Sequence, residues 1–216
     1  MNKKKESSAI KDIIIVTCIT VVAGMLLGFV YNITKEPIAR EQAEARIASQ
    51  RAVFAEAGSF EEAEGLEDQA FVGSYEKGLA DSSITGVKLN SIDKAYDDGK
   101  GRLGYVVDVT DSDGYGGDIE IMVGISSDGS SYRINGISFL KLSETAGMGM
   151  KAKESPFIDG FRELAADEII VYTKTGKTAE NEIDAISGAT ITTNAVTNAV
   201  NAAVIAARTY EEVFQP

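Results

Sequence analysis

Residues 102–126 read RLGYVVDVTDSDGYGGDIEIMVGIS, and the expected architecture starts from this stretch. Two runs rich in Val, Ile and Tyr, Arg102–Val109 and Asp118–Ser126, are separated by the sequence Asp-Ser-Asp-Gly. β-branched and aromatic residues favour strands, whereas Asp, Ser and Gly favour turns. The pattern predicts two neighbouring antiparallel strands.

The same alternation of strand-like and turn-like segments continues on both sides. Ile84–Leu89 and Tyr132–Leu140 are further candidate strands, and Asp-Asp-Gly and Ser-Asp-Gly turns separate the four runs. This spacing predicts an antiparallel meander. A helix near Pro156–Ala165, a strand near Glu168–Lys174 and a final helix from about Thr193 to Arg208 complete an α+β domain.

The N-terminal part of the chain contains a candidate membrane span. Ile13–Tyr31 carries no charge, and a helix of this length nearly covers a hydrocarbon core of about 30 Å. The run is longer than the apolar part of a signal peptide and no small-x-small cleavage site follows it, so we expect it to be retained. Lys3, Lys4, Lys5 and Lys11 precede the span, which predicts a cytoplasmic N-terminus at residues 1–12 and a globular part outside the cytoplasm, anchored by one pass through the cell membrane.

A second helical segment is expected after the span. Glu36–Ala57 is rich in Ala, Glu, Gln and Arg, and Pro37 suits a first turn. We therefore predict a membrane-proximal helix within residues 32–58, with the globular domain at residues 59–216.

Composition excludes several kinds of chemistry. The chain has a net charge of −12 and no His, and its one Cys lies in the apolar run. An acidic body offers no footprint for nucleic acid. Without His, and with one Cys, the chain has no Ser-His-Asp triad, His-ligated metal or iron–sulfur cluster of its own. We predict no catalytic or metal-ligating residue, and any redox role would require an added organic cofactor.

The residues just before the predicted final helix form the most informative stretch, DAISGATIT at residues 184–192. Small residues let the backbone approach a bulky group, and the N-terminus of the following helix presents free N–H groups and a positive dipole end suited to phosphate. The alternative interpretation is an ordinary helix entry with Thr192 or Thr193 as the N-cap. Generic physics alone favours that alternative.

This stretch resembles the flavinylation signature of the FMN-binding domain in the G subunit of the Rnf electron-transport complex and the C subunit of the Na⁺-translocating NADH:quinone reductase. In those families the threonine of Ser-Gly-Ala-Thr is esterified to the FMN phosphate, which implies covalent FMN on Thr190. The resemblance also implies that Asp184, Ser187, Gly188 and Ala189 belong to the signature. It further implies that a flavin transferase using FAD and Mg²⁺ installs the bond.

A second stretch supports the resemblance. Residues 143–149 read SETAGMG, which is similar to the Glu-Thr-Pro-Gly-Leu-Gly loop that lies over the flavin in those families, with alanine and methionine in place of proline and leucine. Flavin contacts are therefore implied for Glu144, Thr145, Gly147, Met148 and Gly149. The sequence Tyr-Gly-Gly-x-Ile at residues 115–119 also matches the families, and we interpret it as structural rather than as a flavin contact.

A competing motif overlaps this loop. Gly147-x-Gly149-x-x-Ala152, with Asp167 further on, satisfies a loose dinucleotide-binding pattern. That pattern requires a buried strand leading directly into the glycines and a helix after them, whereas Glu144 precedes them and Pro156 interrupts any helix. A dinucleotide site is therefore disfavoured.

The resemblance implies an electron-carrying subunit of a membrane complex that transfers electrons between ferredoxin and NAD⁺ while moving Na⁺ or H⁺. Its partners would be the other membrane and peripheral subunits of an Rnf complex, and it would not be an autonomous enzyme. Three alternatives stay open: the C subunit of the quinone reductase, a stand-alone surface flavoprotein, and a flavin-free surface binding module. The chain's brevity favours the G subunit of the Rnf complex.

Overall fold

The computed structural model describes residues 3–99, 101–128 and 131–215, with side chains from Lys11 onward. Lys3, Lys4, Lys5 and Gly129, which figure in the predicted topology and in one predicted turn, lie outside the residues whose side chains are described. The chain divides into two compact units, Met1–Ala45 and Arg46–Pro216. Each is described by itself.

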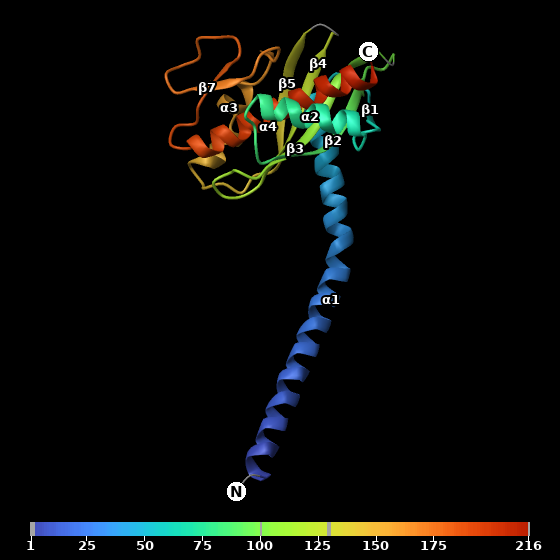
Figure 1. Cartoon of the computed structure of the whole chain (residues 1–216), viewed down its shortest axis with the longest axis vertical. Helices are drawn as coiled ribbons and strands as arrows, with labels where there is room; N and C mark the ends of the chain where they lie inside the picture. Colours follow the sequence, from blue (N-terminus) through green and yellow to red (C-terminus); the bar gives the residue numbers. More distant parts are fainter. Residues whose placement is uncertain (1–2, 100, 129–130, 216) are drawn as a thin grey trace. The chain divides into compact units, whose positions relative to one another are not determined.

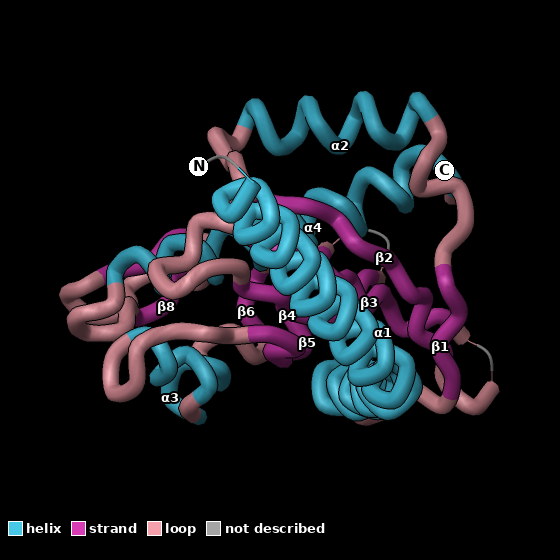
Figure 2. Tube along the Cα trace, turned by 90° about the horizontal axis from the view of Figure 1, so that it is seen from below, coloured by secondary structure: helices cyan, strands magenta, loops and turns pink. Residues whose placement is uncertain are grey.

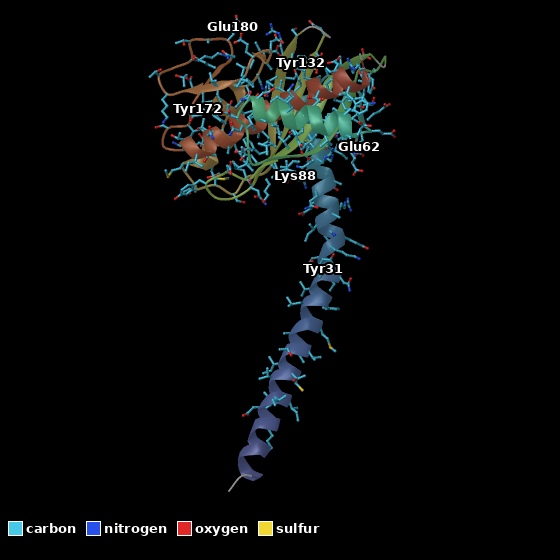
Figure 3. The ribbon with its side chains drawn as sticks, viewed as in Figure 1. Tyr31, Glu62, Lys88, Tyr132, Tyr172 and Glu180 are labelled. Atoms are coloured by element: carbon cyan, nitrogen blue, oxygen red, sulfur yellow. The ribbon has the colours of Figure 1, made fainter. Side chains whose placement is uncertain are left out.

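The first unit consists of helix α1, which extends from Lys3 to Val53 and so also enters the second unit. The apolar side chains of its segment 13–31 are exposed, and Tyr31 is one of them (Figure 3). In the described part of the chain it is the one helix long and apolar enough to cross a membrane, with a mean hydropathy of 2.7 over its most apolar window.

The prediction of a separate helix at Glu36–Ala57, with Pro37 in its first turn, was wrong, because Pro37 lies inside α1. An internal proline removes one backbone hydrogen bond, and here the strong helix formers on either side maintain the helix. The helix also ends at Val53 rather than at the predicted Ala57, because Val53 and Phe54 turn into a buried cluster on the sheet.

The second unit is built on a six-stranded antiparallel sheet in the order β1-β2-β3-β4-β5-β6 (Figure 1). The strands are β1 Ser59–Glu62, β2 Val87–Tyr96, β3 Arg102–Asp111, β4 Ile119–Ser127, β5 Tyr132–Lys141 and β6 Leu164–Ala165. Every strand pairs with its neighbour in sequence. The predicted meander is confirmed, and three of its four strands have the predicted position to within two residues.

Strand β2 differs from its prediction. It covers Val87–Tyr96 rather than Ile84–Leu89, and a bulge between Leu89 and Ser91 shifts its register against β3. Ile84 instead lies in the turn after a helix, where its N–H donates to the carbonyl of Leu79. The polar residues of β2 do not follow a strand-like apolar pattern. They contact charged groups on the face of the sheet where the end of α1 lies.

Two helices cover the other face of the sheet. Helix α4, Thr190–Phe214, lies between the sheet and helix α2, Gln69–Asp81 (Figures 1 and 2). The inward side chains of the strands and the small residues of α4 form a dry core, whose members include Val107, Val123, Ala199, Val200 and Ala203. The final helix is longer at both ends than predicted.

Short elements fill the chain between β5 and α4. They are the 3₁₀ helix η1 (Gly149–Lys153), helix α3 (Ser155–Asp159), and the parallel pair β7 (Val171–Thr173) and β8 (Glu182–Asp184). The predicted helix Pro156–Ala165 was too long, because Gly160 ends it and Glu163 turns the chain with a φ of 55°. Strands β1 and β8 and helix α2 were not predicted.

The last turns of α1 attach to the outer face of the sheet. Arg46 donates to Asp93 at 2.6 Å and to Asp108 at 3.1 Å, and both carboxylates are buried. Burial raises the pKa of Asp108. A hydrogen bond from Asn90 and the positive charge of Arg46 partly offset this increase. The compact domain therefore begins at Arg46, before the predicted start at Ser59.

Candidate functional site

The N-terminus of α4 has no side-chain cap. Ala189 is the N-cap residue, with φ −129° and ψ 53°, and no side chain in the described part of the chain caps the first amides. Neither Thr192 nor Thr193 caps the helix, so the ordinary helix entry considered above was wrong. Because the first-turn N–H groups of an α-helix have no intrahelical acceptor, this end is suited to bind an anion.

Thr193 instead fixes the turn before the helix. Its hydroxyl donates to the carbonyl of Ala189 at 2.9 Å and accepts from the N–H of Ile186 at 3.1 Å. The N–H of Ala189 also donates to the carbonyl of Ile186 at 3.0 Å, and Gly188 has a φ of 79°. Thr190 is thereby held as the first residue of α4, half-buried.

A cavity of about 440 Å³ opens at this helix end. It is lined by residues from three segments: Tyr115; Glu144, Thr145, Met148 and Gly149; and Gly188, Ala189, Thr190, Ile191 and Thr192. The structure thus brings together the loop at residues 144–149 and the turn at residues 188–192, which are about 40 residues apart in the sequence. Each had been identified from its own motif.

Gly149 shows how closely the loop at residues 144–149 approaches α4. A Cβ added to this buried glycine would lie 2.6 Å from both the Glu144 Oε2 and the Thr192 Oγ1. A larger residue there would force the Glu144 and Thr192 side chains to shift. The contact forms one wall of the cavity.

Glu144 connects the loop to a third segment. Its Oε1 accepts the N–H of Gly116 at 3.2 Å, and a Cβ on Gly116 would lie 2.0 Å from the carbonyl oxygen of Ser143. This packing places Tyr115 at the cavity, where 70% of its surface is exposed. Tyr115 therefore lines the cavity, which the interpretation of residues 115–119 as structural did not predict.

Three of the predicted site residues do not line the cavity. Asp184 ends strand β8, opposite Thr173, and is exposed. Ser187 is exposed in the turn before Gly188. Gly147 has a φ of 75° and forms the turn that positions Met148. Ile191 and Thr192 also line the cavity, although they were not predicted as contacts. Their position next to Thr190 in the first turn of the helix could have indicated this.

The cavity fits a phosphorylated ligand with a planar ring. Its volume lies in the range of roughly 300–1,000 Å³ that is typical of small-molecule sites. Its polar end is the uncapped helix N-terminus, whereas Tyr115, Met148 and Ile191 expose apolar surface around it. FMN carries both kinds of group, a phosphate and an aromatic ring system, so the residues present fit this cofactor.

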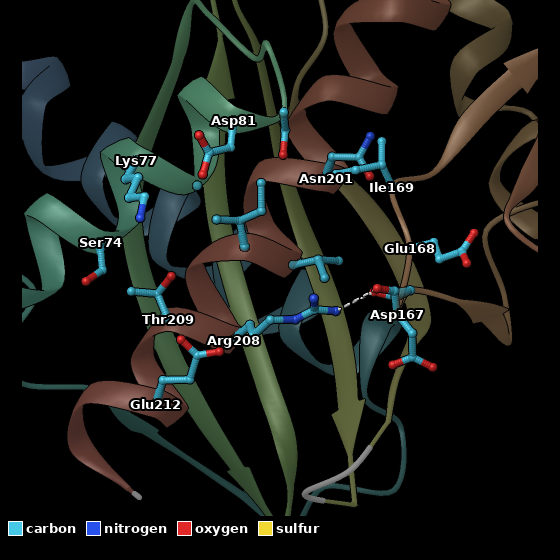
Figure 4. A pocket seen from close by; sticks show the side chains of 15 residues that line it. Ser74, Lys77, Asp81, Asp167, Glu168, Ile169, Asn201, Arg208, Thr209 and Glu212 are labelled. Atoms are coloured by element: carbon cyan, nitrogen blue, oxygen red, sulfur yellow. Dashed lines mark hydrogen bonds between the residues drawn. The ribbon is translucent and has the colours of Figure 1, made fainter.

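A second cavity, of about 460 Å³, lies beside the C-terminal half of α4, α2 and the segment 166–169 (Figure 4). Its lining carries four acidic side chains, those of Asp81, Asp167, Glu168 and Glu212, against the cations of Lys77 and Arg208. The Arg208 guanidinium already donates to the carbonyls of Ala166 and Asp167. An excess of acidic groups opposes a phosphate, so the site at the start of α4 is the stronger candidate.

Comparison with known proteins agrees with this assignment. The sequence model of the FMN-binding domain family matches residues 114–205, which include all three segments that line the site.

Three relatives cover the chain to different extents. The G subunit of the Na⁺-translocating ferredoxin:NAD⁺ oxidoreductase complex of Acetobacterium woodii is 41% identical, over 47% of this chain and 48% of that protein. The G subunit of the proton-translocating ferredoxin:NAD⁺ oxidoreductase complex of Clostridium ljungdahlii is 28% identical, over 94% of this chain and 95% of that protein. The G subunit of the ion-translocating oxidoreductase complex of Methanosarcina acetivorans is 32% identical, over 94% of this chain and 96% of that protein.

Proposed function

Because the chain belongs to the family of G subunits of ion-translocating oxidoreductase complexes, we propose that it carries electrons through FMN esterified to the hydroxyl of Thr190. FMN supplies reversible electron storage, which the side chains of this protein cannot supply themselves. The observation that carries the proposal is the position of Thr190 at the uncapped N-terminus of α4 and at the wall of the cavity.

Each part of the site has a separate role in this proposal. The free amides at the start of α4 bind the phosphate oxygens, and the helix dipole favours their negative charge. The Thr193 hydrogen bonds keep the attachment residue oriented. The apolar surfaces of Tyr115, Met148 and Ile191 contact the ring system and limit its access to water.

An exposed location of the ring suits electron transfer to other proteins. Tyr115, Met148 and Ile191 are exposed by 70%, 47% and 51% respectively, so a ring lying against them keeps one edge accessible. The partners would be the membrane and peripheral subunits of an Rnf-type complex, and a flavin transferase would attach the cofactor. We further propose that the N-terminus is cytoplasmic, that residues 13–31 span the membrane, and that the FMN domain lies on the outer side.

The test of the attachment residue uses the full chain produced in membranes together with a flavin transferase. Intact mass should increase by FMN less one water, and the denatured band should fluoresce under ultraviolet light. Thr190→Ala should remove both signals. Thr85→Ala, which changes an exposed threonine outside the site, should keep them. An unmodified wild-type chain, or an adduct that survives Thr190→Ala, would refute the proposal.

The partner assignment has its own test. Affinity purification of the chain from its native membrane in mild detergent should also recover several polytopic subunits. Recovery of the chain alone, with turnover of a soluble acceptor by that chain, would favour the stand-alone flavoprotein instead.

A further inference from the structure

Met148 is the oxidisable side chain that the structure places at the mouth of the flavin site. It lines the cavity and 47% of its surface is exposed. In the other described parts of residues 46–215 the methionines are Met122, which is fully buried, and Met150, which is half-buried and packs against the core. The one Cys of the chain is Cys18 in α1, and the chain has no His or Trp.

The backbone holds Met148 in this position. Its N–H donates to the carbonyl of Thr145 at 3.1 Å, and its own carbonyl accepts from Lys151 at 3.1 Å. Its side chain reaches the turn before Thr190, since a Cβ added to Gly188 would lie 3.8 Å from the Met148 Cε. The methyl end of the Met148 side chain therefore lies near the turn that precedes Thr190.

We propose that Met148 is a redox modification site, oxidised to methionine sulfoxide by hydrogen peroxide formed at the neighbouring flavin. This inference rests on the proposed function. Bound FMN, once reduced, would supply two electrons and two protons to dioxygen, which would become hydrogen peroxide. The Met148 sulfur then takes one oxygen atom from the peroxide, and water leaves.

The modification changes the contact between the two segments. A sulfoxide turns a flexible apolar side chain into a polar one, and its new oxygen requires a hydrogen-bond donor or water. A polar oxygen beside the Gly188 turn disfavours the apolar packing of the Met148 side chain there, so the loop at residues 144–149 is held less firmly over the site. Methionine sulfoxide reductases reverse this reaction, so the change is a reversible one.

The experiment compares the flavin-loaded full chain with the flavin-free Thr190→Ala chain. Both are reduced with dithionite, desalted without oxygen, exposed to air, and digested with trypsin. The peptide 142–151 contains both Met148 and Met150, so fragmentation of this one peptide gives an internal comparison. A second pair of samples receives the same amount of added hydrogen peroxide.

We expect one added oxygen on Met148 in the loaded chain after the air cycle, about tenfold faster than on Met150, because oxidation follows exposure. The Thr190→Ala chain should show this only with added peroxide. Met148→Leu, which keeps apolar volume and removes the sulfur, should leave Met150 as the only oxidisable side chain of the peptide.

Two results would overturn the proposal. One is equal oxidation of Met148 in the loaded and flavin-free chains after the air cycle, and the other is oxidation of Met148 no faster than Met150 with added peroxide. Failure of the proposed function would look different, because the wild-type chain would then lack the FMN adduct before any cycle. The added-peroxide samples would still measure the accessibility of the Met148 sulfur.

Discussion

The two ends of helix α4 are built in opposite ways. At the N-terminal end, Ala189 leaves the first amides without a side-chain cap and a cavity opens beside Thr190. At the C-terminal end, the ring of Tyr210 packs against those of Phe71, Tyr105 and Phe214 at centroid distances of 6.2, 5.9 and 4.9 Å.

The C-terminal end also contains a satisfied polar network. Glu211 pairs with Arg102 and accepts hydrogen bonds from the Tyr132 hydroxyl at 2.9 Å and from the Ser127 hydroxyl at 3.0 Å. Burial and the Glu211 carboxylate together raise the pKa of Tyr132. One helix therefore stabilises the domain at one end and leaves polar groups available for a ligand at the other. Substitutions at the two ends should separate these roles.

The largest expected effect is on stability at the closed end. Tyr210→Ala removes a side chain that is 4% exposed, and truncation of a buried aromatic residue costs about 3–5 kcal/mol of unfolding free energy. Chemical denaturation monitored by circular dichroism measures this cost. Tyr115→Ala at the open end should stay within about 0.5 kcal/mol, since Tyr115 is largely exposed. Similar losses from both substitutions would contradict the proposed division.

A pH-dependent effect concerns β3, the strand against which α4 packs. Burial raises the pKa of Asp111 to about 6, and its Oδ2 is buried without a hydrogen-bond partner. The folded state therefore binds more protons than the unfolded state between about pH 4 and pH 6.

Protonation of Asp111 should accordingly raise the free energy of unfolding by about 2–3 kcal/mol as the pH falls from above 6 toward 4. This contribution should be lost when the pH rises through 6. Denaturation midpoints measured across this range test the prediction. Asp111→Asn should remove this part of the pH dependence. An unchanged profile in that variant would show that Asp111 does not carry it.

At the open end, Gly149→Ala should lower flavin loading with a smaller change in stability. The added methyl group meets Glu144 and Thr192, and overpacking of this kind costs about 1–3 kcal/mol. The ratio of flavin absorbance to protein reports the loading. Gly73→Ala provides the control, because nothing lies within 4 Å of the added Cβ in α2. Normal loading of Gly149→Ala would contradict the close approach.

The smallest expected effect is at the turn before Thr190. Thr193→Val removes a hydroxyl that makes two buried hydrogen bonds, which should cost about 1–2 kcal/mol. Thr197→Val is the matched control in the same helix, because its hydroxyl makes one bond, to the carbonyl of Thr193 at 2.8 Å. The difference between the denaturation midpoints of the two variants measures the contribution of the turn. Equal midpoints would show that the turn makes no such contribution.

The sequence predicted the parts of the molecule that depend on local pattern. Strands β3, β4 and β5 are continuous apolar or alternating runs, and their Val and Ile side chains are buried as expected. The predicted position of β2 was wrong because a charged residue such as Asp93 is unusual in a buried strand. In the structure Asp93 forms an ion pair with Arg46 of α1, which is distant in the sequence. No local pattern contains that pairing.

The parts of the site that depend on local motifs were likewise predicted, whereas the contacts between them were not. The loop with Glu144 and the turn with Thr190 were both identified from local motifs, but their contact through Gly149 and Thr192 exists only in three dimensions. The place of Tyr115 at the cavity was not predicted, because the hydrogen bond from Gly116 to Glu144 joins two segments that are distant in the sequence. Helix α2 was missed because Gly73 and Gly78 weaken its helical pattern; a Cβ on Gly78 would lie 2.6 Å from Ile205 of α4.

The position of Thr190 on the helix that completes the core has a consequence for biogenesis. The strands can pair as a meander from neighbouring sequence alone, but their apolar face is covered only after α4 has packed against it. The turn that precedes Thr190 is tied to that helix by the Thr193 hydroxyl. In the proposed attachment, a flavin transferase that recognises this geometry would modify folded molecules and not unfolded ones, so attachment would also select for correctly folded protein.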